Sequence, residues 1–201
     1  TPVNIEAIPG VLKDRPQWVC WRWEWKADKQ KWDKPPYRAD ATCRASSTDP
    51  STWSAFAQAV DAYQSGRFDG IGFVVTADDP FCGIDLDKCL GEAWAIDLIQ
   101  SMDSYTETTP SGNGYRVWLE ADASAMCSKS KDFHKSRVEV YDRGRYFTVT
   151  GQRMEIAPES IKPRQGALEA ACKPLLNCSN ATPADHRGVA QQGSTAVLGD
   201  D

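Results

Sequence analysis

The sequence predicts a single α+β domain in which a mostly antiparallel sheet is flanked by helices. Short apolar runs with two-residue alternation recur along the chain, and a few segments with helical spacing of apolar residues separate them. Gly, Pro and Asp lie between most neighbouring runs, as expected of turns. With 201 residues, of which 41% are hydrophobic and 25% charged, the chain is long enough to bury a substantial core.

The first half of the chain is expected to hold a strand, a long loop, a helix and a hairpin. "WVCWRWEW" (18–25) alternates apolar and polar residues and predicts one strand, whereas Pro35, Pro36 and Pro50 forbid regular structure across most of the next segment. "WSAFAQAVDAYQSG" (53–66) predicts a helix capped by Asp49 or Ser51 and ended by Gly66. "GIGFVV" and "FCGIDL", separated by "TADDP", predict a hairpin.

The second half predicts a helix at 92–102, a strand at 104–109 and another strand from residue 115. The polar segment 122–136 is expected to be a mobile loop, and two further strands, 137–142 and 145–151, are joined by a tight turn. We assign residues 1–160 to the main domain. Residues 161–201 are assigned to a short helix and a flexible linker that leads to a missing C-terminal module.

Composition excludes several classes of protein. No window reaches the length of a membrane span and the first residues lack a secretory signal, so we place the chain in the cytoplasm without a membrane partner. Its seven cysteines form no C-x-x-C pair, which predicts reduced thiols and no zinc site. The net charge is −5, but an acidic section (51–125) with three basic and twelve acidic residues separates two basic flanks. This division would place a cation site beside a phosphate-binding surface, although scattered solvated charge gives the same counts.

The stretch "FCGIDLDKC" (81–89) contains two carboxylates on one strand. Asp85 and Asp87 project from the same face about 7 Å apart. A surface strand with Lys88 as an ion-pair partner would explain them, but Ile84 and Leu86 favour a strand in the sheet interior. Two close carboxylates repel each other unless a cation joins them, and oxygen ligands of this kind suit Mg²⁺ or Mn²⁺.

A third carboxylate is found in "RVEVYD" (137–142). Glu139 lies between two valines on a predicted strand, whereas Asp142 is at the strand end and could equally cap the turn. Three acids on neighbouring strands that hold two cations fit phosphoryl or nucleotidyl transfer. We therefore take Asp85, Asp87 and Glu139 as candidate catalytic and metal-binding residues.

The segment "TPSGNGYR" (109–116) is a candidate anion-binding turn. Ser111 offers a hydroxyl group, and Gly112 and Gly114 let backbone N–H groups approach phosphate oxygens. Arg116 can hold a phosphate bidentately if it points to the same side. Hairpin loops use the same residues, so the motif alone is weak evidence.

Taken in order, these motifs resemble the primase-polymerase (PrimPol-like) domains of the archaeo-eukaryotic primase superfamily, of the phage or plasmid type. The resemblance runs over about residues 15–152, through the motifs "PQWVCWRWEW", "KPPY", "ASSTDPSTW", "DGIGFVVTADDPFCGIDLDKC", "SYTETTPSGNGYRVW" and "VEVYDRGRYFTVTG". It implies an RRM-like catalytic core for residues 1–160. It also implies a template-directed nucleotidyltransferase, that is, a DNA primase and polymerase of phage or plasmid replication.

By position, the resemblance assigns two Mg²⁺ or Mn²⁺ ions to Asp85, Asp87 and Glu139, and the nucleoside triphosphate to the Ser111–Gly112–Gly114 turn. Arg116 stands where the family pattern has His. Arginine retains the positive charge but does not titrate near neutral pH. Neither His134 nor His186 lies where it would obviously replace that histidine.

Further contacts are implied less directly. Lys34 could touch phosphate, or be an ordinary solvated lysine, and Arg143 and Arg145 could reach nucleotide or template phosphate. Tyr146 resembles a residue near the sugar, although packing explains the ring nearly as well. The tryptophans at 18, 21, 23 and 25 could stack on single-stranded bases, but alternating Trp on a strand is more often core.

The expected partners are a single-stranded DNA template and primer, (d)NTP substrates and a helicase module or protein. Two alternatives remain open at this point. One is a catalytically weakened nucleotide- and DNA-binding module of replication initiation, and the other is a metal-dependent nuclease, since three acids also serve phosphodiester hydrolysis.

Overall fold

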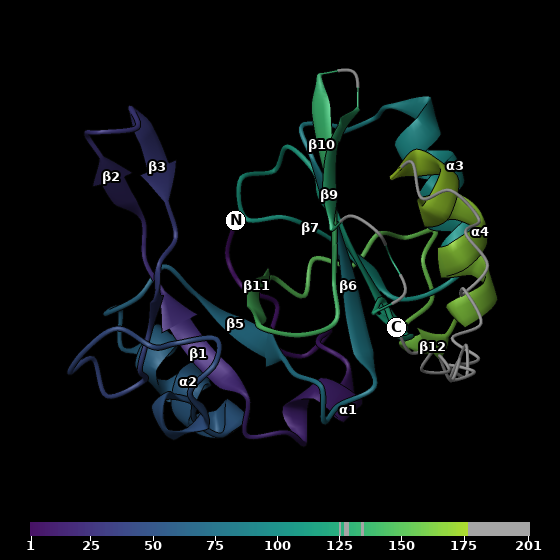
Figure 1. Cartoon of the computed structure of the whole chain (residues 1–201). Coiled ribbons are helices and arrows are strands. Elements are labelled where there is room, and N and C mark those ends of the chain that lie inside the picture. The colour runs from purple at the N-terminus through teal and green to yellow at the C-terminus, as the bar shows by residue number, and fades with distance from the viewer. Residues whose placement is uncertain (125, 127–128, 134, 177–201) are drawn as a thin grey trace, which may run out of the picture.

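The computed structural model describes residues 1–124, 126, 129–133 and 135–176, and contains two mostly antiparallel sheets side by side (Figure 1). The first sheet has the strand order β11-β5-β1-β4. Its strands are β1 (Trp18–Trp21), β4 (Pro36–Tyr37), β5 (Gly70–Val75) and β11 (Arg145–Val149). A separate two-stranded arm is formed by β2 (Glu24–Lys26) and β3 (Lys31–Asp33).

The second sheet has the order β12-β8-β6-β10-β9, and β7 pairs with the free part of β8. All its pairings are antiparallel except the short parallel pair of β12 with β8. Its strands are β6 (Phe81–Asp87), β7 (Thr106–Thr108), β8 (Tyr115–Glu120), β9 (Ser130–Phe133), β10 (Ser136–Tyr141) and β12 (Lys162–Pro163).

Helices cover one side of each sheet (Figure 1). Helix α2 (Phe56–Gln64) packs on β1 and β5, whereas α3 (Ala93–Met102) and α4 (Gln165–Leu175) pack on each other beside the second sheet. Two short helices, α1 (Gly10–Lys13) and the 3-10 helix η1 (Pro50–Thr52), complete the fold. None of the helices in the described ranges is long and apolar enough to cross a membrane.

Strand β6 shows how this packing places polar residues. Ile84 and Leu86 point into a core shared with α3 and α4, which includes Leu98 and Leu168. Since successive side chains alternate on a strand, Asp85 and Asp87 face the opposite way. The core on one side of β6 therefore directs the two carboxylates toward the first sheet.

The α+β prediction with mostly antiparallel strands is confirmed, as are the expected strands from residue 115 and within 137–151 and the expected helix at 92–102. The short helix expected after residue 160 is α4. Five cysteines in the described ranges are free thiols, four of them buried. The predicted linker at 177–201 lies outside the described residues. The RRM-like primase core and the domain boundary at residue 160 stay predictions.

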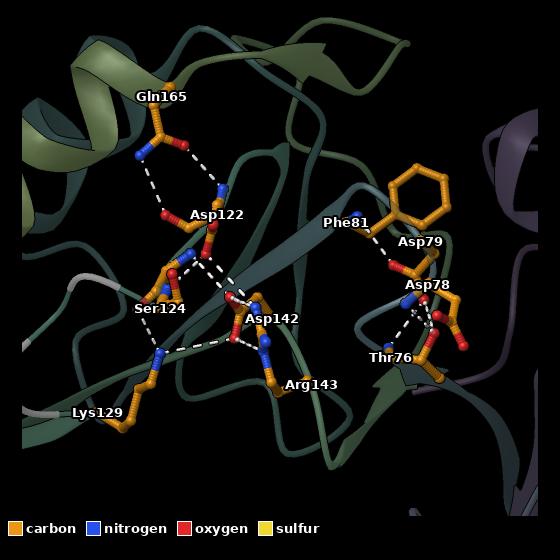
Figure 2. Close-up of polar contacts among 11 residues, drawn as sticks. Thr76, Asp78, Asp79, Phe81, Asp122, Ser124, Lys129, Asp142, Arg143 and Gln165 are labelled. Carbon is orange, nitrogen blue, oxygen red and sulfur yellow. Dashed lines mark hydrogen bonds and ion pairs between the residues drawn. The ribbon is translucent and has the colours of Figure 1, made fainter.

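The predicted hairpin of residues 70–86 is wrong. β5 lies between β1 and β11, and β6 lies between β8 and β10, so neither strand has an edge left for the other. The turn between them redirects the chain: the Asp79 carboxylate accepts hydrogen bonds from the N–H groups of Thr76 and Phe81 (Figure 2). The chain thus crosses from one sheet to the other at this point.

Three further boundaries differ from the prediction. The single strand predicted at 18–25 is broken at Arg22–Trp23, where the Trp23 N–H donates to the Asp69 carboxylate instead of a strand partner. Asp49 caps η1, so α2 begins only at Phe56. Two segments expected to be irregular contain the short strands β4 and β9, which pair with β1 and β10.

Candidate functional site

A cleft of about 660 Å³ lies between the two sheets. Its walls are formed by the polar face of the second sheet, by β11 and by the segment that follows β3. The expected site residues that line this cleft are Lys34, Asp85, Asp87, Ser111, Arg116, Glu139, Arg145 and Tyr146. The structure therefore brings together side chains from five separate parts of the chain.

Strand register explains why charged residues meet on the cleft floor. Asp85 lies directly opposite Arg116 of β8 on one side and directly opposite Glu139 of β10 on the other. Arg116 in turn lies opposite Glu107 of β7. Directly opposed residues in an antiparallel sheet share a face, so the four side chains form a row across β7, β8, β6 and β10. The charges along this row are negative, positive, negative and negative.

Arg116 is the centre of this row and is only 6% exposed. Its Nη2 donates to Asp85 Oδ1 at 2.6 Å, and its Nη1 donates to the carbonyl oxygen of Thr148 at 2.6 Å and to Thr148 Oγ1 at 2.9 Å. The guanidinium carbon also lies 4.7 Å from the centroid of the Phe147 ring. Because Thr148 and Phe147 are on β11, Arg116 links the two sheets across the cleft.

Gly83 provides the space for this arrangement. A Cβ atom at residue 83 would lie 2.5 Å from the Phe147 ring, closer than a real contact allows. The ring can therefore rest on β6 beside Asp85 only because residue 83 has no side chain.

Asp87 is in a different electrostatic state. It is partly buried, and within the described ranges its carboxylate has no hydrogen-bond or ion-pair partner. Burial and the neighbouring Asp85 raise the pKa of its carboxyl group above the ordinary value. Such a group has a carboxylate oxygen available for a cation.

Glu139 is held by two arginines. Arg137 Nε donates to Oε1 and Arg145 Nη2 donates to Oε2, both at 2.9 Å. Its carboxylate is 11% exposed, whereas both arginines are nearly half exposed. Both oxygens of Glu139 are therefore engaged by positively charged side chains.

Carboxylate oxygens are the donors that Mg²⁺ and Mn²⁺ prefer, so the residues at the cleft floor fit these ions by chemistry. In the arrangement described, however, no group of three His, Cys, Asp or Glu residues within the described ranges is placed to hold a metal ion. The Asp87 carboxylate and Asp85 Oδ2, which Arg116 does not contact, are the oxygen atoms most available to a cation. Glu139 could bind a cation only after Arg137 or Arg145 has released its carboxylate.

In the Gly-rich turn, Thr109 and Ser111 line the cleft, whereas the expected phosphate-binding residues Gly112 and Gly114 are not part of its lining. Gly112 has φ +71°, which favours glycine, and a Cβ at Gly114 would lie 2.0 Å from the carbonyl oxygen of Leu86. The Thr109 N–H donates to the Gly114 carbonyl at 3.0 Å, and the Thr109 and Ser111 hydroxyl groups are 3.2 Å apart. Glycine is thus required here by the turn and by its contact with β6, and Ser111 faces the cleft.

The outer residues divide between two places. Lys34 Nζ lies 4.6 Å from the Trp23 ring centroid, and burial together with the charge of Arg116 lowers the pKa of its amino group. The Tyr146 hydroxyl donates to the Lys34 carbonyl oxygen, and burial raises the pKa of this phenol. These contacts join β11 to the segment after β3 at the cleft wall.

Arg143 and Asp142 lie elsewhere, where they line a second, smaller pocket and contact each other (Figure 2). Arg143 pairs with Asp142 at 3.0 Å, and Asp142 also accepts a hydrogen bond from the Ala123 N–H at 2.9 Å. Arg143, which was expected to reach nucleotide or template phosphate, does not line the main cleft. Asp142 fixes the loop after β8 through the Ala123 N–H group. Of the two candidate third acids, Glu139 is the one in the cleft. His134 and His186 lie outside the described residues.

Sequence reasoning missed Glu107 and Thr148. Glu107 is 1% exposed, and its Oε2 accepts the Gly151 N–H at 2.7 Å while Oε1 has no partner within the described ranges. Burial raises the pKa of this carboxyl group, and the charge of nearby Arg116 opposes that shift. The pattern "TETT" could have indicated an inward acid by alternation, but the role of Thr148 depends on a contact between sheets that no local pattern encodes.

Comparison with known proteins adds an independent observation. No protein-family model matches the chain. A DNA primase-polymerase of Nitratiruptor phage NrS-1 is 37% identical to it over 157 residues. The chain resembles a phage-type primase-polymerase. The aligned part covers 74% of this chain but 21% of the phage protein, so the chain spans about a fifth of this relative's length.

Proposed function

We propose that this chain is the nucleotidyl-transfer part of a DNA primase-polymerase. The observation that carries the proposal is the single cleft that holds Asp85, Asp87, the Ser111 turn and Arg116. The likeness to the phage primase-polymerase supports the same reaction. In this reaction the 3′-hydroxyl oxygen of a primer bonds to the α-phosphorus of a nucleoside triphosphate, the bond to the β-phosphate breaks, pyrophosphate leaves, and the hydroxyl proton passes to solvent.

The residues of the cleft divide this work by their chemistry. Arg116 and Lys34 supply positive charge for the polyphosphate, and the turn at Ser111 offers a hydroxyl group beside them. Arg145 of β11 lines the same cleft, and its partner Glu139 limits the directions in which it can move. Tyr146, fixed through the Lys34 carbonyl, offers a rigid ring against which a nucleoside could rest.

Asp85 and Asp87 would hold divalent cations, with Glu139 as the third acid once an arginine releases it. Two Mg²⁺ or Mn²⁺ ions bound there would activate the attacking hydroxyl group and stabilise the charge of the leaving pyrophosphate. Arg116 is paired with Asp85 in the structure. When a triphosphate binds, its oxygens would attract Arg116 away from Asp85, and the Asp85 carboxylate would become free to hold a cation. Arg116 would thus exchange one anionic partner for another.

The whole-protein setting follows from the same proposal. The strand to be copied is single-stranded DNA with a primer, the substrates are ribo- or deoxyribonucleoside triphosphates, and the replicon is that of a phage or plasmid. A helicase module or protein would unwind the duplex ahead of the cleft.

A template-directed primer-extension assay with Mg²⁺ or Mn²⁺ tests this function, with Asp85→Ala and Asp87→Ala as variants. We expect extension by the parent chain and loss of at least about a hundredfold in each variant. Ile156→Ala, an exposed position outside the cleft lining, serves as the matched control. Unchanged incorporation in either aspartate variant would refute the assigned role. Release of fragments from labelled single-stranded DNA without nucleotides would instead indicate a nuclease.

A second candidate is favoured by one observation, the 2.6 Å contact of Arg116 with Asp85. A fixed arginine on a candidate metal ligand suits a nucleotide- and DNA-binding module of replication initiation with weak catalysis. The discriminating variant is Arg116→His. If the parent only binds nucleotide and DNA while this variant gains synthesis, the binding module is the better description of the parent.

A further inference from the structure

The arm formed by β2 and β3 projects away from the two sheets (Figure 1). An isolated two-stranded hairpin is marginally stable in water. Trp25 and Trp32 lie directly opposite each other in this arm, with ring centroids 5.6 Å apart and planes at 64°. The arm therefore presents a pair of indole rings at some distance from the core.

Both rings face solvent. Trp25 is 48% and Trp32 is 60% exposed, whereas Trp18 in β1 is completely buried. The expectation that the tryptophans of 18–25 belong to the core is thus right for Trp18 and Trp21 and wrong for Trp25. Two large aromatic side chains left in water on one projecting element are typical of a binding surface.

The arm is continuous with the cleft. Strand β3 ends at Asp33, and Asp33 and Lys34 both line the cleft wall. Trp23, which stands just before β2, lies under the amino group of Lys34 at 4.6 Å. The base of the arm is therefore part of the cleft wall.

The charges of the arm indicate the chemistry of a bound partner. The arm (24–33) is neutral overall, because its three lysines are matched by Glu24, Asp28 and Asp33, and Lys26 and Lys31 lie directly opposite each other. Lys26 is paired with Glu24 at 3.2 Å. The Lys29 and Lys31 side chains make no ion pair or hydrogen bond within the described ranges. Two amino groups thus remain available to an anionic partner.

We propose that the β2–β3 arm binds single-stranded DNA, with bases stacked on Trp25 and Trp32 and backbone phosphates near Lys29 and Lys31. Exposed aromatic rings and free lysines together are the combination that holds unpaired strands, because every base has a face to stack while a duplex hides those faces. The inference rests on the proposed function, since the bound strand would be the template that enters the cleft along Asp33 and Lys34.

Fluorescence anisotropy of a labelled oligothymidylate with the full chain tests the arm. We expect Trp25→Ala/Trp32→Ala to weaken binding by about tenfold or more, and Trp25→Phe/Trp32→Phe to retain most of the affinity because it keeps stacking surfaces. Ile156→Ala removes a comparably exposed apolar side chain elsewhere and is expected to bind like the parent. For Lys31→Gln, the slope of log K against log salt should fall by about 0.7.

Parent-like affinity of the alanine pair, or an equal loss of affinity in the phenylalanine pair, would overturn the inference. So would an equal weakening of binding to blunt duplex DNA, because that would indicate general electrostatics. These outcomes are separate from failure of the proposed function: if the parent extends a primer while the alanine pair binds DNA normally, only the arm inference falls. If the parent neither extends primers nor binds single strands, both fall.

Discussion

Replacing Arg116 by methionine is expected to destabilise the protein strongly. The side chain is 6% exposed and its partner Asp85 is 13% exposed, so the change leaves an almost buried carboxylate without its cation. Removing one partner of a buried ion pair typically costs about 3–5 kcal/mol, and Thr148 loses two hydrogen-bond donors as well. We expect the free energy of unfolding to fall by about 3 kcal/mol or more.

Urea denaturation followed by tryptophan fluorescence measures this loss, in a cycle of Arg116→Met, Asp85→Asn and the double variant. If the pair exists as described, the double variant should lose less stability than the two single losses together, by about 1–3 kcal/mol. Additivity within about 0.5 kcal/mol would refute the reasoning, because it would mean that the two side chains do not interact in the folded protein.

The same variants examine the cation site without measuring activity. In Arg116→Met, Asp85 and Asp87 share the cleft floor without an arginine, so Mn²⁺ should stabilise this variant more than the parent. A ligand present at a hundred times its dissociation constant adds about 2.7 kcal/mol. No gain in urea midpoint with Mn²⁺ in either protein would contradict a metal site at these carboxylates.

Two further outcomes are expected. Gly114→Ala places a Cβ 2.0 Å from the Leu86 carbonyl oxygen, so it should lower the free energy of unfolding by about 1–3 kcal/mol and weaken nucleotide binding. The control Gly166→Ala meets open space in α4 and should be neutral or stabilising. Equal stability of the two variants would contradict the close approach at Gly114. The buried Glu107 keeps its proton above its ordinary pKa of 4.5, so the folded state binds more protons than the unfolded state between the two pKa values. The free energy of unfolding should therefore fall as pH rises through that window. Glu107→Gln should flatten this part of the stability profile, and an unchanged profile would show that Glu107 does not titrate there.

Local pattern was sufficient for much of the fold. Alternation placed β8, β10 and β11, and the D-x-D spacing put Asp85 and Asp87 on one face of β6, because side-chain direction on a strand depends only on position. Local pattern did not determine which strands pair with each other. The turn at "TADDP" indicated a hairpin, but β5 and β6 each pair with two other strands, in different sheets.

The candidate site shows the same division. Residue type and spacing indicated which side chains carry charge, and the structure places eight of them in one cleft. The pairing of Arg116 with Asp85 could not be foreseen, since it depends on the register between β6 and β8, which are distant in sequence. The absence of such a partner for the Asp87 carboxylate within the described ranges likewise depends on the folded arrangement and not on a local pattern.

A structure of the chain with a nucleoside triphosphate and Mn²⁺ tests the central claim most directly. The account predicts manganese density between Asp85 and Asp87, with the triphosphate against the Ser111 turn and the guanidinium of Arg116 turned from Asp85 toward phosphate oxygen. Manganese or triphosphate bound away from this cleft, with the Arg116–Asp85 contact intact, would contradict it.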